Sequence, residues 1–433
     1  MNRSFCFKPR LAALILIIAL VCPLLAGCLE SASLDEFGYA LSIGVQKGEQ
    51  KTYRIYLLVQ KESSDAEAQQ SGGGTVLGAE GNSIFDALEI INLGAPYQIN
   101  LTRVEYIAFS EEIARSELMQ EFLSLSFNSL RMQKSVNLLV VEGNIDEFFE
   151  GYNLEETPNI TKLQYDISRD LENMGLVSVM NASEFFESVL NKRADAVLGY
   201  GVIDSSIVTS DEQTEQEQGG GQGGGQGGGQ GGGQGGEQSG EEGGEEGKPE
   251  DTLGGIQRFG GMKSAVYGCA VFDEWKMAGV LDGHDTQALL MARGEFVKGT
   301  LVLNVENGIL AVGLSAINKP NIRIELEPEL KAELSISIRC SIRQDSTGLV
   351  YKYRIADIEQ MVEKHLETQL DRIFKGCLEM NSDAIGFGRA AAMKFSSAKK
   401  WEEYRWKDQY QRLQASFKVN VDIDDEGTKQ GME

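Results

Sequence analysis

Short runs of apolar residues recur along the chain and predict β-strands. In residues 52–60, Tyr53, Ile55 and Leu57 lie two positions apart, which is the spacing of one face of a strand. Together with residues 38–45 this run predicts a hairpin that turns within residues 47–51. Further strands are predicted at residues 103–109, 136–141, 265–272, 276–281, 300–306, 309–314, 322–326, 332–342 and 415–423.

Apolar residues at helical spacing predict helices between these strands. The longest covers residues 355–378, where apolar positions recur every three or four residues and His365 shares their stripe. Asn181 and Glu184 form a capping-box pattern that opens a helix through residue 190. Other helices are predicted at residues 83–92, with Asn82 as the cap, and at residues 144–149 and 285–293. A further helix is predicted to begin after Ser110, which would cap a first turn that contains acidic residues.

A low-complexity tract divides the pattern into two halves. From Asp211 to Asp251 the chain carries eleven acids against Lys248 and little apolar surface, so it cannot offset its ordering entropy. We predict a disordered Gly/Gln/Glu linker over residues 209–255. The flanking parts are a region at 28–208, with one or two subdomains, and a domain at 256–427 with a tail at 428–433. Their irregular mixture of strands and helices predicts an α+β fold of several small mixed α/β domains with antiparallel sheets.

The first 28 residues have the pattern of a bacterial lipoprotein signal. Basic residues precede an apolar stretch at 11–25 that is too short for a spanning helix, and Leu25-Ala26-Gly27-Cys28 closes it. We therefore predict a signal peptide at residues 1–27 and lipidation of Cys28, with acyl chains as the membrane anchor.

Composition narrows the classes of partner. The chain has 433 residues and a formal net charge of −25, which argues against nucleic acid and against direct adhesion to anionic lipid. Attachment to a membrane is then expected through the acyl chains and protein partners.

The residues that most often bind metals or react covalently form no convincing constellation. His284 lies between Asp282 and Asp285, a pattern better explained by a turn and helix cap than by a metal site. His365 is expected to be a partly buried, hydrogen-bonded histidine. The chain has no Gly-x-Ser-x-Gly nucleophile elbow, and we predict no catalytic, cofactor or metal residue.

Three cysteines and an aromatic cluster are interpreted as packing residues. Cys269, Cys340 and Cys377 are expected to be buried, with a disulfide among them the less favoured alternative. Trp401, Tyr404, Trp406 and Tyr410 suit either a docking surface or a core, and the core is slightly favoured. The acidic tail from Asp422 to Glu433 nearly fits a calcium loop, but a solvated tail is the preferred interpretation.

Several segments together resemble the Ger(x)C family of spore-germination lipoproteins, the C subunits of germinant receptors. After the lipobox, the resemblance lies in residues 34–45, 81–94, 102–114, 270–272, 277–283, Asp383 to Arg389, Trp401, Trp406 and 419–423. The chain departs from the family at Glu30-Ser31-Ala32, where Trp-Asp and basic residues are usual, and in the length of the linker.

The resemblance implies a non-enzymatic subunit required for triggering germination, anchored on the outer face of the inner spore membrane. Its partners would be an A subunit and a multi-span B subunit that resembles amino-acid transporters. Two alternatives come from other classes of protein: a solute-binding lipoprotein that delivers a small molecule to a transporter, and a cell-wall enzyme. A linker of some 40 residues would defeat the hinge of a two-lobed binding protein.

Overall fold

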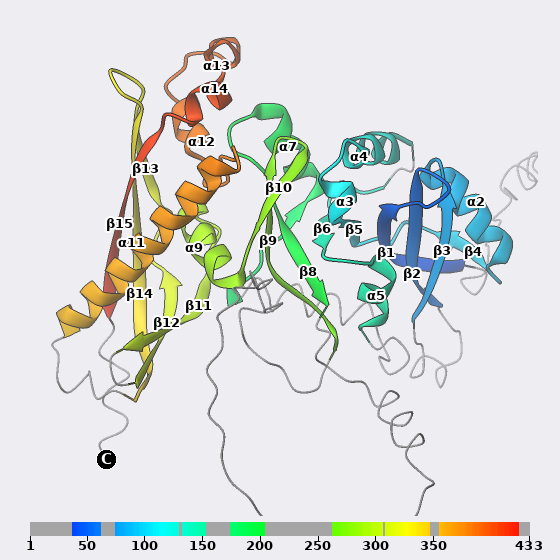
Figure 1. Cartoon of the computed structure of the whole chain (residues 1–433), viewed down its shortest axis with the longest axis horizontal. Helices are drawn as coiled ribbons and strands as arrows, with labels where there is room; N and C mark the ends of the chain where they lie inside the picture. The colour runs from blue at the N-terminus through cyan, green and yellow to red at the C-terminus, as the bar shows by residue number, and fades with distance from the viewer. Residues whose placement is uncertain are drawn as a thin grey trace, which may run out of the picture.

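Two β-sheets form the framework of the protein (Figure 1). The computed structural model describes residues 37–61, 74–129, 132–152, 174–203, 262–305, 308–346 and 355–423. Cys28, the signal peptide, the predicted linker and the acidic tail beyond residue 423 lie outside these residues.

The first sheet is mixed. Its path runs β10-β9-β8-β6-β5-β1-β2-β3, with β4 paired to β1 and β7 paired to β6. The hairpins β1–β2 and β9–β10 are antiparallel, whereas β1, β5, β6 and β8 run parallel to one another. The strands are β1 (Phe37–Lys47), β2 (Tyr53–Lys61), β3 (Gly74–Gly81), β4 (Gln98–Asn100), β5 (Tyr106–Ser110), β6 (Asn137–Val141), β7 (Met180–Asn181), β8 (Val197–Ile203), β9 (Ser264–Asp273) and β10 (Lys276–Leu281).

Helices cover both faces of this sheet. Within β5, Ile107 and Phe109 belong to one core while Ala108 between them belongs to another, as the two-residue period of a strand requires. The first core includes residues of α2 (Ile84–Gly94), α3 (Glu111–Ala114), α4 (Leu118–Ser129) and α7 (Ala182–Asn191). Residues of α5 (Ile145–Glu150) pack in the second core, on the opposite face.

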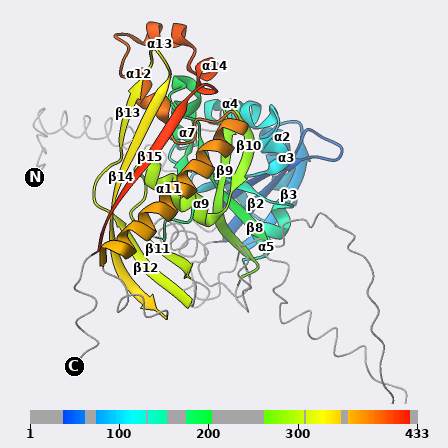
Figure 2. The same ribbon diagram turned by 60° about the vertical axis from the view of Figure 1, so that its left-hand side comes forward.

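The second sheet packs against one long helix. Its path is β11-β12-β14-β13, with β15 pairing parallel to β14. The long helix α11 (Ile355–Glu379) crosses the sheet (Figure 2). The strands are β11 (Lys298–Val305), β12 (Gly308–Ala316), β13 (Asn321–Glu325), β14 (Lys331–Asp345) and β15 (Gln414–Ile423).

Glutamates of α11 accept hydrogen bonds from the backbone N–H groups on the outer edge of β15. Glu359, Glu363 and Glu367 lie four residues apart, on one side of the helix. Their carboxylates accept hydrogen bonds from the backbone N–H groups of Ile423, Val421 and Val419, at 3.0, 2.9 and 3.1 Å respectively. These N–H groups face away from β14, so the helix supplies the acceptors that another strand would otherwise provide.

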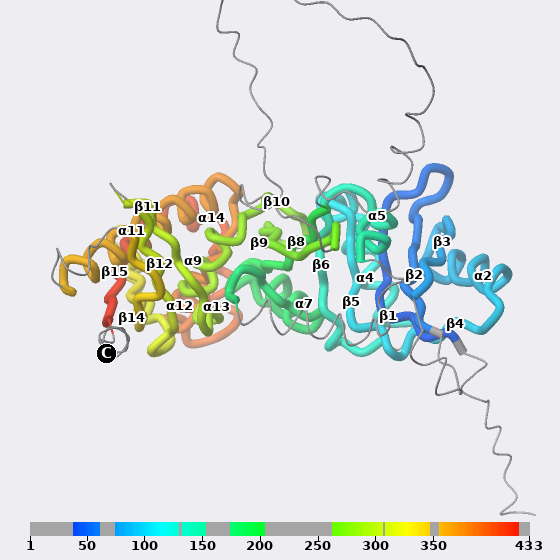
Figure 3. Tube along the Cα trace, turned by 90° about the horizontal axis from the view of Figure 1, so that it is seen from below, coloured from blue at the N-terminus to red at the C-terminus, as the bar shows by residue number. Residues whose placement is uncertain are grey.

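Strand β9 joins the two halves of the protein. It follows residues 204–261 in the chain, yet it pairs with β8 and continues the first sheet (Figure 3). Ala270 and Phe272 face the first core, whereas Cys269 and Val271 face the core of the second sheet. Helix α9 (Gly283–Arg293) also packs in the core of the second sheet.

The α+β class is confirmed, and most predicted elements are present. The capping box of Asn181 and Glu184 is formed as predicted. The parallel centre of the first sheet was not anticipated, and several elements were missed, among them strands β3, β4, β7 and β8 and helix α4. The strands predicted at residues 300–306 and 309–314 pair as a hairpin, and residues 306–307 between them lie outside the described residues.

Two predicted helix caps were wrong in detail. Ser83, and not Asn82, caps α2, because its side chain accepts the Asp86 N–H while the Asn82 backbone N–H donates to the Asp86 carboxylate. Ser110 occupies the cap position of α3, but its buried side chain makes no capping bond.

A carboxylate on β3 organises the turn between β1 and β2. Glu80 accepts backbone N–H bonds from Glu49 and Gln50, both at 2.9 Å, and from Lys51 at 3.2 Å. Its cross-strand neighbour Arg54 donates to it at 2.7 Å. The backbone N–H groups of this turn, followed by Arg54, hold the pKa of Glu80 down at about 2.

Replacing Glu80 with Gln should remove an acid-sensitive part of the stability. The folded pKa lies below the ordinary value of 4.5, so the ionised carboxylate stabilises the fold above that pH and the contribution is lost as the pH falls toward 2. Urea unfolding should therefore separate the wild type from Glu80→Gln more at pH 7 than at pH 3. An equal separation at both pH values would contradict this role.

Candidate functional site

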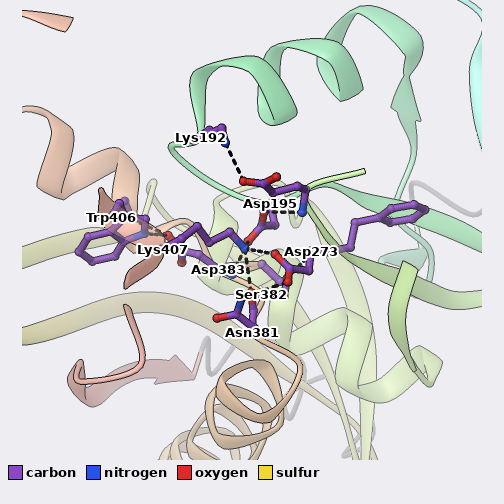
Figure 4. A network of polar contacts seen from close by, with 12 residues as sticks. Lys192, Asp195, Asp273, Asn381, Ser382, Asp383, Trp406 and Lys407 are labelled. Atoms are coloured by element: carbon purple, nitrogen blue, oxygen red, sulfur yellow. Dashed lines mark hydrogen bonds and ion pairs between the residues drawn. The ribbon is translucent and has the colours of Figure 1, made fainter. Parts of the chain in front are cut away.

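A buried polar network connects the two halves where β9 meets the core of the second sheet (Figure 4). We call it the joint and define it by the side chains or backbone of Asp195, Asp273, Asn381 to Asp383, Trp406 and Lys407. Asp195 precedes β8, Asp273 ends β9, and Asn381 to Asp383 follow α11. Trp406 and Lys407 begin α14 (Trp406–Tyr410), which follows α12 (Phe387–Ala392) and α13 (Ala398–Tyr404). Segments far apart in the sequence therefore meet in one place.

Lys407 is the cation at the centre of the joint. Its Nζ donates to Asp195 Oδ2 at 2.5 Å, to Asp273 Oδ1 at 2.7 Å and to the carbonyl of Asn381 at 2.7 Å. Only 17% of its side chain is exposed. Burial lowers the pKa of Lys407, but the Asp195 and Asp273 carboxylates raise it by more, so the ammonium stays charged.

Asp195 ties the loop before β8 to the loop after α11. Its Oδ2 accepts the Asp383 backbone N–H at 2.6 Å, and its own N–H donates to the Asp383 carbonyl at 3.0 Å. Its Oδ1 accepts the Glu274 N–H at 3.3 Å. Burial raises the pKa of Asp195, and the charge of Lys407 opposes that rise. The carboxylate thus links three backbone segments and a cation.

The Asp383 carboxylate binds the backbone of the Gly386-Phe387-Gly388 stretch that follows it. Its Oδ1 accepts the N–H groups of Gly386 at 3.0 Å and Phe387 at 2.9 Å. Its Oδ2 accepts the Gly388 N–H at 2.6 Å and Trp406 Nε1 at 2.9 Å. A fully buried carboxylate therefore receives the free N–H groups at the start of α12. Burial raises the pKa of Asp383 to about 7, and the N–H donors, led by Gly388, act in the opposite direction.

Both glycines of this stretch are required by geometry. Gly386 has φ of +91°, a conformation that L side chains rarely adopt. A Cβ on Gly388 would lie 2.7 Å from the Arg193 carbonyl oxygen and 2.7 Å from Trp406 Nε1. Side chains here would push apart the segments that the joint holds together.

Arg293 and Trp401 add hydrogen bonds around the joint. Arg293, at the end of α9, has a fully buried side chain whose Nη1 donates to the carbonyls of Asp195, at 3.4 Å, and Ala384. Trp401 Nε1 donates to the Asn191 carbonyl at 3.2 Å. Helix α9 is thereby bound to the loop that carries Asp195, and α13 is bound to the end of α7, just before that loop.

The aromatic cluster is core, as the sequence slightly favoured. Trp401, Trp406 and Tyr410 are 5%, 3% and 0% exposed and belong to the core of the second sheet. Tyr404 is half-buried and lies against Trp401 and Trp406. Of these rings, Trp406 reaches the joint directly, because its Nε1 donates to Asp383.

Neither of the two histidines, His284 and His365, belongs to the joint. His284 is exposed in the first turn of α9, and Asp282 caps that helix by accepting the Asp285 N–H, as predicted. His365 was expected to be partly buried, but it is exposed because it flanks the buried stripe formed by Val362 and Leu366. No group of three or more potential metal ligands occurs among the described residues.

The three cysteines are buried and free, as expected. Burial raises the pKa of Cys269 to about 12, and its Sγ accepts a hydrogen bond from Thr286 at 3.1 Å. No described helix is both long enough and apolar enough to cross a membrane.

Sequence reasoning missed most of the joint. Asp383 lay within a segment that was singled out, but Asp195, Asp273 and Lys407 gave no local signal. Each is a single charged residue in a chain where such residues are common. Only the meeting of distant segments gives them a shared role.

Replacing Asp383 with Asn should destabilise the protein by about 2–6 kcal/mol. In either orientation of the amide, its NH₂ group faces two N–H donors, and each buried donor left unpaired costs about 1–3 kcal/mol. Urea unfolding of the unlipidated chain measures the change. The control Asp371→Asn, on α11, loses only an i,i+4 pair with Lys375 and should cost no more than about 0.5 kcal/mol. Equal effects of the two substitutions would contradict the importance of the joint.

The comparisons with known proteins cover both sides of the predicted linker. Residues 30–203 match a family described as "Spore germination protein N-terminal domain", and residues 267–427 match "Spore germination B3/ GerAC like, C-terminal". A solved structure, "Crystal Structure of the GerBC protein", is similar in fold with a TM-score of 0.50 at 11% identity. That similarity covers 88% of this chain and 96% of the other. No curated protein matches the chain. Because the two family matches together span most of its length, the chain belongs to the Ger(x)C family of spore-germination proteins.

Proposed function

We propose that this protein is the lipid-anchored C subunit of a nutrient germinant receptor. In this role it is non-catalytic and is required to trigger germination of the spore. Its partners are an A subunit and a multi-span B subunit. The observation that carries the proposal is the pair of family matches, which lie in order on the two sides of the linker.

The N-terminal sequence supports the proposed location. Leu25-Ala26-Gly27-Cys28 ends a stretch with the composition of a secretory signal. Lipidation of Cys28 would hold the folded part on the outer face of the inner spore membrane. Two acyl chains anchor a protein stably, whereas one chain binds only marginally.

The joint favours a scaffold over a hinged solute-binding protein. A binding protein of that class opens and closes two lobes around its ligand. Here β9 belongs to the first sheet but packs in the core of the second sheet. Lys407 of α14 binds two carboxylates at the ends of first-sheet segments, Asp195 before β8 and Asp273 on β9. Opening the two halves about this point would separate buried charges, so a fixed arrangement that presents two surfaces to partners is the better match.

Replacing Cys28 with Ala should release the protein from spore membranes and reduce the germination response. The loss follows because the acyl acceptor is removed while the folded part is unchanged. Membrane fractionation and incorporation of labelled palmitate measure the anchor directly. The matched control is Cys22→Ala, which changes a cysteine within the apolar part of the signal. Unchanged fractionation and labelling of Cys28→Ala would refute the anchor.

The receptor role predicts a stable complex in the membrane. A tagged chain purified in mild detergent from spore membranes should carry with it a multi-span protein and a second, partly soluble membrane subunit. Asp383→Asn should lower the yield of both, because it disturbs the relative position of the two halves, whereas Asp371→Asn should not. Recovery of the wild-type chain alone would contradict the proposal. A rise in melting temperature with amino acids or sugars would favour the solute-binding alternative.

A further inference from the structure

A groove on the second sheet combines cationic and hydroxyl side chains with the apolar side chains of Met174, Leu176 and Val302. It has a volume of about 770 Å³. Lys298, Arg339 and Arg343 line it from the sheet, and His284 lines it from the first turn of α9. None of its described lining residues is Asp or Glu. This is an unusual environment in a chain whose formal net charge is −25.

Strand register brings the polar groups of the groove together. Lys298, Ser315 and Arg339 form one cross-strand row on β11, β12 and β14, and Thr300, Gly313 and Ser341 form the next. The alternate residues on these strands, including Leu301, Leu314 and Cys340, are buried in the core. The two rows therefore lie on the outer face of the sheet. Successive residues on one face are roughly 7 Å apart, so both rows lie within reach of one small ligand.

Gly313 allows Arg343 to lie across the floor of the groove. A Cβ at residue 313 would be 2.7 Å from Arg343 Nε and 2.9 Å from Ser341 Oγ. The guanidinium therefore occupies the space that a side chain would fill. Any other residue at this position would displace the arginine from beside the serine hydroxyl.

Two of the cations are not neutralised by the described part of the chain. Neither Lys298 nor Arg343 forms an ion pair with another described residue. Elsewhere on the same sheet Arg323 lies 4.0 Å from Glu333, and Lys331 lies 2.6 Å from Glu329. Lys298 and Arg343 thus bring to the groove positive charge with which no described carboxylate forms an ion pair.

We propose that this groove binds a small phosphate-bearing molecule. A phosphate group carries about −1.5 to −2 charges and three acceptor oxygens, which suits several cations with hydroxyl donors better than a single carboxylate does. The guanidinium of Arg343 offers a planar pair of donors, Lys298 offers a point charge, and Thr300 and Ser341 offer O–H groups. The volume lies within the range of about 300–1,000 Å³ for small-molecule sites. The inference goes beyond the proposed receptor role and does not depend on it.

Titration calorimetry of the full mature chain in detergent tests the site. The probes are inorganic phosphate and glycerol 3-phosphate at fixed ionic strength, and the expected result is saturable binding of one molecule per chain. Arg343→Gln and Lys298→Gln should each weaken binding about tenfold or more. Gly313→Ala should also weaken it, although it removes no charge. The control Arg323→Gln removes an exposed cation of β13 outside the groove and should leave binding unchanged.

The outcomes separate a built site from general electrostatics. Absence of saturable phosphate binding would overturn the proposal. Equal weakening by Arg323→Gln and Arg343→Gln would also overturn it, because the protein's overall charge would then explain the affinity. Binding to phosphatidylglycerol vesicles without binding of either soluble probe would overturn the small-molecule assignment in favour of a membrane surface. Loss of the A and B partners in the purification described above would leave this result unaffected.

Discussion

The interaction of Lys407 with Asp195, Asp273 and the Asn381 carbonyl fixes how the two sheets are arranged. Its ammonium is largely withdrawn from water and has acceptors from both halves of the protein. Removing one partner of such a buried pair costs about 3–5 kcal/mol, because the remaining charge is left without compensation. Asp383 extends the same network to the start of α12 through three backbone N–H donors, and to α14 through Trp406 Nε1. The arrangement is specified by polar groups that only one register of the segments can satisfy.

The apolar packing around the joint supports the same arrangement. Alternate residues of β9 belong to two cores, so this strand of the first sheet packs against the first core on one face and against the core of the second sheet on the other. Helix α11 closes the far edge of the second sheet by placing three glutamates against β15. A body built in this way presents fixed surfaces at both ends, which suits a subunit that holds partners in position at a membrane.

The sequence predicted much of the local structure because local structure has local causes. The apolar run within residues 276–281 and the apolar stripe of residues 355–378 predicted β10 and α11 almost to their ends. The Asn181 capping box could be read from two residues three positions apart. Strand β8 was missed because Gly199 and Gly201 interrupt its pattern, and both glycines are required where neighbouring side chains or backbone approach closely. His365 was misjudged because a helical stripe has edges, and periodicity alone does not say which edge residues contact a sheet.

By itself, the sequence determined the α+β class, most elements, the presence of an acidic glycine-rich tract, and the resemblance that led to the Ger(x)C family. The tertiary structure alone decided that β9 completes the first sheet, that Lys407 meets Asp195 across 212 positions, and that Lys298, Arg339 and Arg343 line one groove. The physical reason is that helix and strand periodicity depends on neighbours along the chain. Networks of single charged residues depend instead on contacts between segments far apart in sequence, and no local pattern encodes those contacts.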